Sequence, residues 1–114
     1  MKEEMTMQLL TYNDGKEVLN HGGCVGQSLL NAEGLEFVHL RVAPQSILPL
    51  HALPHPVFFY VLEGQGTLLT EGDTHEAQPG TLIECPADMP RGWENRTTAD
   101  LALLVIKNME AAPV

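Results

Sequence analysis

Residues 50–66, LHALPHPVFFYVLEGQG, join two histidines to a strongly apolar run and a glycine-containing turn. Residues 57–62 are rich in β-branched and aromatic side chains, and the EGQG at 63–66 is typical of the turn that follows a strand. Because both alternating sets of side chains in this run are apolar, we expect a strand that is covered on both sides. Pro54 and Pro56 precede it, at a position where a strand can start.

The rest of the chain repeats this pattern of short strands and turns. Turn signals rich in Gly, Asp, Asn and Pro recur throughout. Residues 35–43 alternate between an apolar face (Val38, Leu40, Val42) and a mixed face, and further strands are predicted at 67–71, 81–85 and 101–107. Residues 26–31 are the best candidate for a short helical segment. Many short strands at regular turn spacing predict an all-β sandwich or barrel.

Length and charge restrict the organisation and the partners. The chain has 114 residues, near the commonest domain size, so residues 1–114 are interpreted as one domain with loosely held ends at 1–12 and 110–114. Its formal charge is −9, which argues against nucleic acid and anionic membranes, because these partners bind basic patches. No apolar run reaches the roughly 18 residues of a membrane span.

The cysteines indicate a reducing environment. Cys24 and Cys85 are too few for a disulfide framework, and MKEEMTMQLL at the start lacks the pattern of a secretory signal. We therefore expect reduced thiols and a cytoplasmic protein. Cys85 lies in a predicted strand and is interpreted as a small buried hydrophobe. His21 and Cys24 are assigned to a glycine-rich loop, and His75 to an exposed turn.

From residue 42 to residue 107 the sequence resembles the cupin superfamily of small jelly-roll barrels. LPLH at 48–51 and YVLEGQG at 60–66 are similar to the start and end of the first cupin motif. PGTLIECPADMPRGWEN at 79–95 is similar to the second motif, with its Pro-Gly turn, its aromatic residue and its closing asparagine. The resemblance implies an all-β double-stranded β-helix, or jelly-roll barrel, with a core at about residues 35–107. This fold hosts enzymes, binding proteins and regulators, so it does not select one activity.

Metal sites of the family use three histidines and one glutamate. Carried over motif by motif, the first histidine position is His51. The second histidine position falls on Leu53, the glutamate position on Val57 and the third histidine position on Arg91. The resemblance therefore implies the barrel without the family's full set of metal ligands.

His55 offers a substitute ligand. On one continuous strand, residues 51, 53, 55 and 57 would all point into the barrel. His51 and His55 would then be about 13 Å apart, too far to share an ion held at about 2.1 Å, unless a bulge brings them together. One possibility is a divalent transition metal (Fe, Mn, Ni or Zn) on these two histidines, with water, His39 or Glu84 as a third ligand. The second is two histidines that line or border a pocket.

Arg91 raises a second question, because an unpaired charge inside a small barrel is unfavourable. Its guanidinium could pair with a carboxylate such as Glu84 or Glu94. It could swing to the rim and be solvated. It could also hold the carboxylate or phosphate of a ligand through its planar set of donors.

A ligand held by Arg91 predicts an apolar pocket with a few polar groups, the usual composition of a small-molecule site. The predicted lining residues are Leu53, Val57, Phe59, Met89, Trp93, His51, His55 and Arg91. The leading hypothesis is binding of, or modest chemistry on, a small anionic organic molecule. In it Arg91 pairs with the anion, His51 and His55 donate hydrogen bonds or shuttle protons, and Trp93 packs on the ligand. Two further hypotheses are a metal-dependent oxygenase or isomerase using the two histidines, and a non-catalytic sensor or structural module.

The predicted strand at 57–62 also has an apolar outer face. If Val57, Phe59 and Val61 point inward, the outward side chains are Phe58, Tyr60 and Leu62. So large an apolar surface is expected to be covered by another layer or a partner subunit. The resemblance implies that two subunits pair through such a sheet, so we predict a closed, two-fold homodimer, and we assign His39, beside Arg41, to an outer sheet face or a dimer contact.

Overall fold

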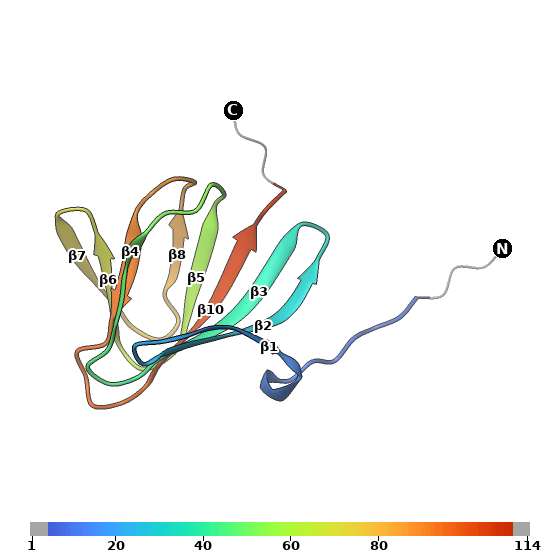
Figure 1. Cartoon of the computed structure of the whole chain (residues 1–114), viewed down its shortest axis with the longest axis horizontal. Helices are drawn as coiled ribbons and strands as arrows, with labels where there is room; N and C mark the ends of the chain where they lie inside the picture. The colour runs from blue at the N-terminus through green and yellow to red at the C-terminus, as the bar shows by residue number, and fades with distance from the viewer. Residues whose placement is uncertain (1–4, 111–114) are drawn as a thin grey trace.

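The computed structural model describes residues 5–110, which form ten strands and one short 3-10 helix (Figure 1). The elements are η1 (Tyr12–Asp14), β1 (Lys16–His21), β2 (Cys24–Ala32), β3 (Leu35–Val42), β4 (Ile47–His51), β5 (Val57–Glu63), β6 (Gly66–Thr70), β7 (Asp73–Ala77), β8 (Leu82–Cys85), β9 (Arg91–Glu94) and β10 (Leu101–Asn108). Within the described range no helix is long and apolar enough to cross a membrane. The expectation of loosely held ends falls in part on residues 1–4 and 111–114, which lie outside that range.

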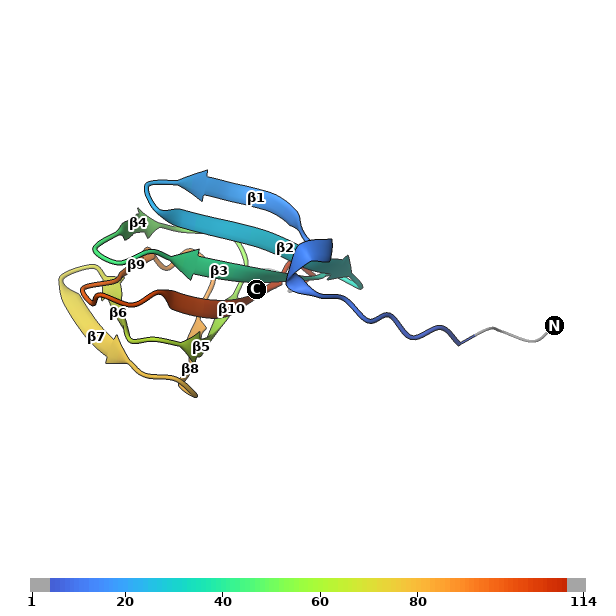
Figure 2. The same ribbon diagram turned by 90° about the horizontal axis from the view of Figure 1, so that it is seen from below.

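The strands form two antiparallel sheets that face each other across the interior (Figure 2). One sheet has the order β1-β2-β3-β10-β5-β8, and the other has the order β4-β9-β6-β7. Side chains from both sheets fill one hydrophobic core, with Trp93 and Leu68 from the smaller sheet packed against Leu103 and Phe59 from the larger one. The structure confirms the predicted all-β jelly-roll barrel.

The strands predicted at 35–43, 57–62, 67–71, 81–85 and 101–107 are confirmed within a residue or two, as β3, β5, β6, β8 and β10. The helical candidate at 26–31 is wrong, because these residues lie inside β2. That strand pairs with β1 on one side and β3 on the other, so its hydrogen bonds are all between strands. Tertiary pairing overrides the weak local preference.

The interior side chains of the larger sheet change character along the strands. On β10 the inward positions run Leu101, Leu103 and Val105, all buried, and the next inward position is Lys107. The Lys107 ammonium lies 3.4 Å from the carboxylate of Glu36, the corresponding inward position of β3. Ser28 also donates a hydrogen bond of 2.8 Å to Glu36. One end of the interior is therefore apolar and the other carries charged groups.

His39 lies on the outer face of β3, as predicted, where the ring of Tyr12 packs edge-on against it at 4.9 Å. Burial lowers the pKa of His39, and nearby Arg41 lowers it further. A backbone hydrogen bond and Glu63 act in the opposite direction. The folded chain thus holds this imidazole in its neutral form more strongly than the unfolded chain does.

This shift predicts that the fold loses stability in mild acid. Below the ordinary histidine pKa of 6.5 the unfolded chain binds a proton at His39 that the folded chain does not. The free energy of unfolding should therefore fall as the pH drops through 6.5 towards the lower folded pKa, and it should fall less in His39→Gln. Urea denaturation at several pH values, with His75→Gln as the exposed control, measures this; equal slopes in wild type and His39→Gln would contradict it.

Gly92 allows β4 and β9 to approach closely. A Cβ at this position would lie 2.4 Å from the carbonyl oxygen of Leu48, 2.9 Å from the carbonyl carbon of Pro49 and 3.0 Å from the nitrogen of Leu50. All three atoms belong to the backbone, so no side-chain rotation can relieve the clash. The same stretch of β4 contains the register shift between Leu48 and His51.

We therefore expect Gly92→Ala to push β4 away from β9 and to destabilise the fold by about 1–3 kcal/mol, the usual range for overpacking. Urea denaturation gives the change in the free energy of unfolding. A loss below about 0.5 kcal/mol, the range of neutral surface changes, would show that the close approach is not required.

Candidate functional site

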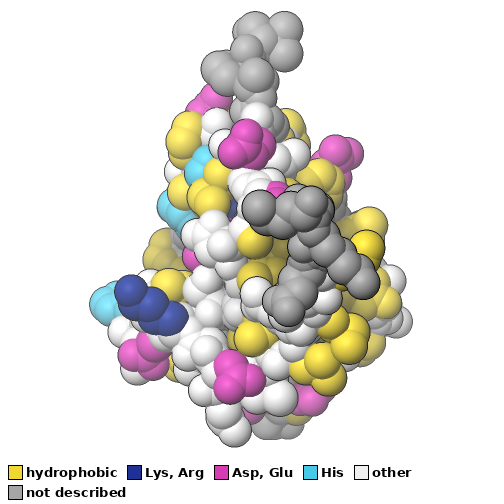
Figure 3. Space-filling view, turned by 90° about the vertical axis from the view of Figure 1, so that its right-hand side faces the viewer, with side chains coloured by type: hydrophobic (Ala, Val, Ile, Leu, Met, Phe, Trp, Pro, Cys, Tyr) yellow, Lys and Arg dark blue, Asp and Glu magenta, His cyan; other side chains and the backbone are white. Residues whose placement is uncertain are grey.

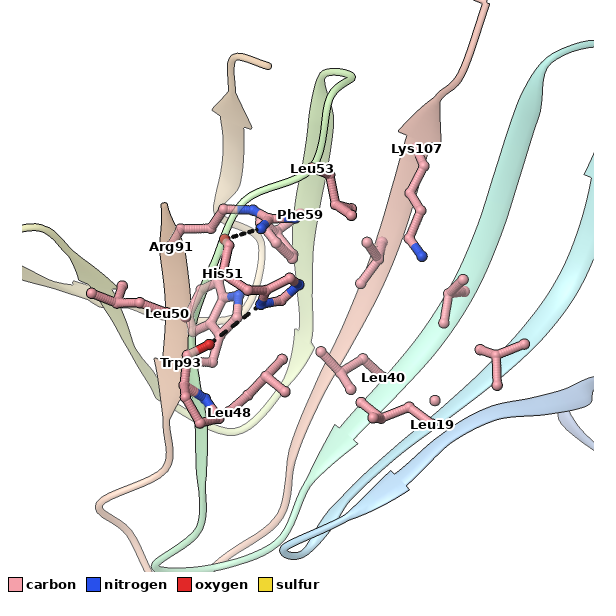
Figure 4. Close-up of a pocket in the computed structure, with 16 residues that line it drawn as sticks. Leu19, Leu40, Leu48, Leu50, His51, Leu53, Phe59, Arg91, Trp93 and Lys107 are labelled. Atoms are coloured by element: carbon pink, nitrogen blue, oxygen red, sulfur yellow. Dashed lines mark hydrogen bonds between the residues drawn. The ribbon is translucent and has the colours of Figure 1, made fainter. Parts of the chain in front are cut away.

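A cavity of about 470 Å³ lies between the two sheets (Figure 4). Its wall is mostly apolar and includes side chains from both sheets. The lining residues are Val18, Leu19, Gly26, Val38, Leu40, Leu48, Pro49, Leu50, His51, Leu53, Phe59, Arg91, Gly92, Trp93, Val105 and Lys107. No aspartate or glutamate belongs to this set, so the charged groups on the wall are cations.

Arg91 is the most unusual residue of this wall. It is only 3 % exposed, and its guanidinium donates a hydrogen bond to the main-chain carbonyl of His51, its cross-strand partner. The guanidinium carbon lies 5.8 Å from the centre of the Phe59 ring. Within residues 5–110 no carboxylate forms an ion pair with Arg91. A cation is therefore buried with a carbonyl and an aromatic ring as its partners.

The structure contradicts both a carboxylate pair and a solvated rim position for Arg91. Glu94 bonds to Arg96 at 2.9 Å, and Glu84 is exposed on β8. Burial excludes a solvated position at the rim. Burial lowers the pKa of Arg91, and it raises the pKa of the nearby Cys85 thiol, which therefore supplies no negative charge at neutral pH. Arginine nevertheless keeps its proton in proteins, so the guanidinium is charged.

His51 ends β4, and its ring points into the cavity next to Arg91 (Figure 4). Its Nδ1 lies 3.3 Å from the carbonyl oxygen of Pro49. Since a carbonyl can only accept a hydrogen bond, this contact assigns the proton of the neutral ring to Nδ1. The Nε2 lone pair of that tautomer is then free to interact with a molecule in the cavity.

Trp93 and Phe59 form the deep part of the wall. Their rings pack edge-on, with centres 5.5 Å apart and planes at 76°. Trp93 is fully buried, and its indole nitrogen has no hydrogen-bond partner among the described residues. Gly66 leaves room for the indole, because a Cβ there would lie 2.8 Å from the Trp93 ring.

Of the predicted lining residues, the cavity brings together His51, Leu53, Phe59, Arg91 and Trp93. His55, Val57 and Met89 are not among its lining residues. Val57 is 1 % exposed and packs in the core. Met89 lines a second, more polar hollow of about 430 Å³ beside Cys85 and Thr70.

The break between β4 and β5 explains why His55 does not line the cavity. Residues 51–57 are not one strand, since β4 ends at His51, β5 begins at Val57, and Pro54 and Pro56 interrupt the segment between them. The alternation that would point His55 inward is therefore lost.

The donor set does not fit the metal site of the family. In the described part of the chain, no group of three or more His, Cys, Asp and Glu side chains could hold a metal ion. His51 is the one imidazole on the cavity wall. The side chains of the wall are therefore the groups that can act on a molecule in the cavity.

Sequence reasoning missed most of the wall, including Lys107 and the β1–β2 hairpin. Lys107 falls within the strand predicted at 101–107, and counting its inward positions on from Val105 would have found it. Val18, Leu19 and Gly26 come from the β1–β2 hairpin, which lies before the region of cupin resemblance. No motif marks these residues in the sequence.

Solved structures with this fold are numerous but distant in sequence. The polyketide cyclase RemF from Streptomyces resistomycificus superposes with a TM-score of 0.80 at 24 % identity, covering 95 % of this chain and 83 % of that one. A predicted oxalate decarboxylase from Thermotoga maritima gives 0.78 at 17 % identity, covering 90 % and 99 %. KdgF from a Halomonas species gives 0.76 at 15 % identity, covering 90 % and 94 %. At these identities the likeness shows the fold alone.

No curated protein matches the chain by sequence. The family model for the cupin domain, however, matches residues 38–107, which include β3 to β10 apart from the first and last few residues and contain both cupin-like motifs. That match covers more than half of the chain, and it agrees with the two-sheet barrel and with the three structural neighbours. The chain belongs to the cupin family.

Proposed function

We propose that this cupin binds a small organic anion with an apolar body inside its barrel. The observation that carries the proposal is the guanidinium of Arg91, which is 3 % exposed and has no carboxylate partner among residues 5–110. A buried cation without an anion is unfavourable, and a ligand anion would remove that penalty. One N–H of Arg91 bonds to His51, which leaves further donors for a ligand.

The rest of the wall supports the same ligand class. Around Arg91 the cavity presents aliphatic and aromatic side chains, which suit an apolar body. Lys107, which is paired with Glu36 at 3.4 Å, places a second cation on the wall. Two proteins of this fold are named as a polyketide cyclase and a predicted oxalate decarboxylase. Both names refer to organic substrates, which supports an organic ligand at the level of the fold.

The variant Arg91→Met should change stability and ligand affinity in opposite directions. Without ligand, the variant should be more stable than wild type by about 1–3 kcal/mol, because a methionine needs no counter-charge in an apolar wall. Its affinity for an anion should fall about 10- to 150-fold, the equivalent of losing a charged hydrogen bond of about 1.5–3 kcal/mol. Urea denaturation measures the first change. Calorimetric titration with adamantane-1-carboxylate and 2-naphthoate, each beside its neutral alcohol, measures the second.

Arg96→Met is the matched control, since Arg96 pairs with Glu94 on the surface. It should change the free energy of unfolding and the affinity for the anion little, because exposed ion pairs contribute little to stability. The proposal is contradicted if neither carboxylate binds to wild type, or if Arg91→Met binds both carboxylates as tightly as wild type does.

We also propose that the partner of this chain is a second copy, bound through the outer face of β5 and β8. Tyr60 and Leu82 are cross-strand neighbours on this face and are 40 % and 65 % exposed. Leu62, two residues along β5, is 44 % exposed. Together with half-buried Phe58 they form an apolar patch of the kind that marks interfaces.

The N-terminal arm, residues 5–11, supplies the complementary surface. Met5, Met7 and Leu9 are 94 %, 80 % and 78 % exposed, and as alternate residues of an extended segment they share one side. The arm projects away from the barrel (Figures 1 and 2). On the side from which it projects, hydrophobic side chains are spread over the surface among acidic ones (Figure 3).

Geometry favours a second copy over the arm's own sheet. The arm leads into η1, whose Tyr12 packs against His39 on the outer face of β3. From there the arm runs away from the barrel and not across its own sheet towards β5 and β8 (Figures 1 and 2). It therefore leaves the patch of its own chain uncovered. In a two-fold dimer each arm can instead cover the patch of its partner, and the exchange is reciprocal.

We expect the wild-type chain to have the mass of a dimer in light scattering after size exclusion at micromolar concentration. Deletion of residues 1–10, and separately the double variant Tyr60→Lys/Leu82→Lys, should each give monomers, because each removes one half of the contact. Ile47→Lys is the control, since Ile47 is 49 % exposed but lies on β4 of the other sheet. A monomeric wild type, or dimers in both variants, would be inconsistent with this interface.

A further inference from the structure

The cavity wall combines one proton acceptor with two cationic groups. These are the guanidinium of Arg91, which has no carboxylate partner among residues 5–110, and the ammonium of Lys107, which is paired with Glu36 at 3.4 Å. His51 is the one lining side chain that can take up a proton, since the wall has no carboxylate. A site with this balance does not hold a cation, but it favours the conversion of a neutral molecule into an anion.

From this arrangement we infer that the barrel catalyses enolisation: His51 removes a proton from the carbon next to a carbonyl, and Arg91 holds the oxygen on which the negative charge develops. This inference rests on the proposed function and extends it from binding to proton transfer. The substrate class is a largely apolar ketone or β-dicarbonyl compound.

The position of the two groups supports the pairing. His51 and Arg91 are cross-strand partners in β4 and β9, and the guanidinium is bonded to the carbonyl of His51 itself. The Nδ1 proton is engaged by Pro49, which leaves Nε2 as the acceptor. Base and anion-binding group therefore stand on paired strands and line the same cavity, so one bound molecule can contact both.

The step balances without a cofactor. The C–H bond breaks and its proton moves to Nε2, which makes His51 an imidazolium. The electron pair forms the new C=C bond, and the carbonyl electrons move to the oxygen held by Arg91. Return of the proton to the opposite face of the same carbon inverts its configuration. Attack of the enolate carbon on a second carbonyl of the same molecule closes a ring, and the imidazolium protonates the new alkoxide.

Three other groups that could accept a proton lie near the cavity, and none of them fits the role of the base. The carboxylate of Glu36 is held by Ser28 and Lys107 and is not part of the wall. Cys85 is buried outside the wall, and burial raises its pKa, so it stays a thiol. His55 lies on the loop between β4 and β5 and does not line the cavity. The role of base is thereby assigned to His51.

The test follows hydrogen–deuterium exchange at the acidic CH₂ of 2-tetralone in D₂O by proton NMR, with the full chain. Wild type should accelerate the exchange over buffer, and His51→Gln should lose about 10²–10⁴-fold of that acceleration, the usual contribution of a general base. His55→Gln is the matched control and should exchange like wild type. His51→Gln should still bind 2-naphthoate in calorimetry, because Arg91 is unchanged.

The outcomes separate this inference from the binding proposal. If 2-tetralone binds but exchanges equally fast with wild type and His51→Gln, the enolisation is wrong and binding stands. If 2-naphthoate binds and 2-tetralone does not, the assigned substrate class is wrong. If neither binds, the binding proposal has failed and the enolisation fails with it.

Discussion

The buried guanidinium of Arg91 is the constraint on which the rest of this site depends. Transfer of an ion from water into an apolar wall is strongly unfavourable, so the charge must be compensated by directed contacts. The chain provides two, the carbonyl of His51 and the face of Phe59. A carbonyl dipole and an aromatic quadrupole stabilise a cation less than a carboxylate does. The charge is held in place but not neutralised, and the proposed binding of an anion rests on this difference.

The backbone geometry of β4 fixes both groups at once. Because Gly92 has no side chain, β4 packs directly onto β9 at Leu48 and Pro49. The register shift that follows brings His51 opposite Arg91. One local packing arrangement thus fixes the positions of two carbonyl groups. The carbonyl of His51 holds the guanidinium, and the carbonyl of Pro49 orients the imidazole. Of the four positions that the cupin resemblance assigns to metal ligands, His51 keeps its imidazole, Arg91 carries a cation, and Leu53 and Val57 are apolar.

Much of the barrel could be predicted from the sequence, and less of the site. Strands with two-residue alternation, such as β3, and the second motif around Trp93 carry their signal locally, so their place in the fold was confirmed. His55 was misplaced because alternation was extended through two prolines that end one strand before the next begins. The partner of Arg91 could not be predicted, because it is a backbone carbonyl, which every residue has. The β1–β2 hairpin reaches the cavity through strand pairing that no local pattern encodes, whereas Lys107 continues the alternation of β10.

The distribution of charge limits which anion suits the cavity. The chain has a formal charge of −9, so its long-range field repels anions, although salt screens that field beyond about 8 Å. Recognition must therefore act at short range, within the barrel, through Arg91 and the groups around it. A compact, multiply charged anion would lose its hydration and find mostly apolar neighbours. A carboxylate or enolate with one delocalised charge and a large apolar body loses less hydration and gains more contact. If the proposed function holds, the lack of a carboxylate partner for Arg91 among residues 5–110, together with the apolar wall, favours a ligand that is mainly hydrophobic.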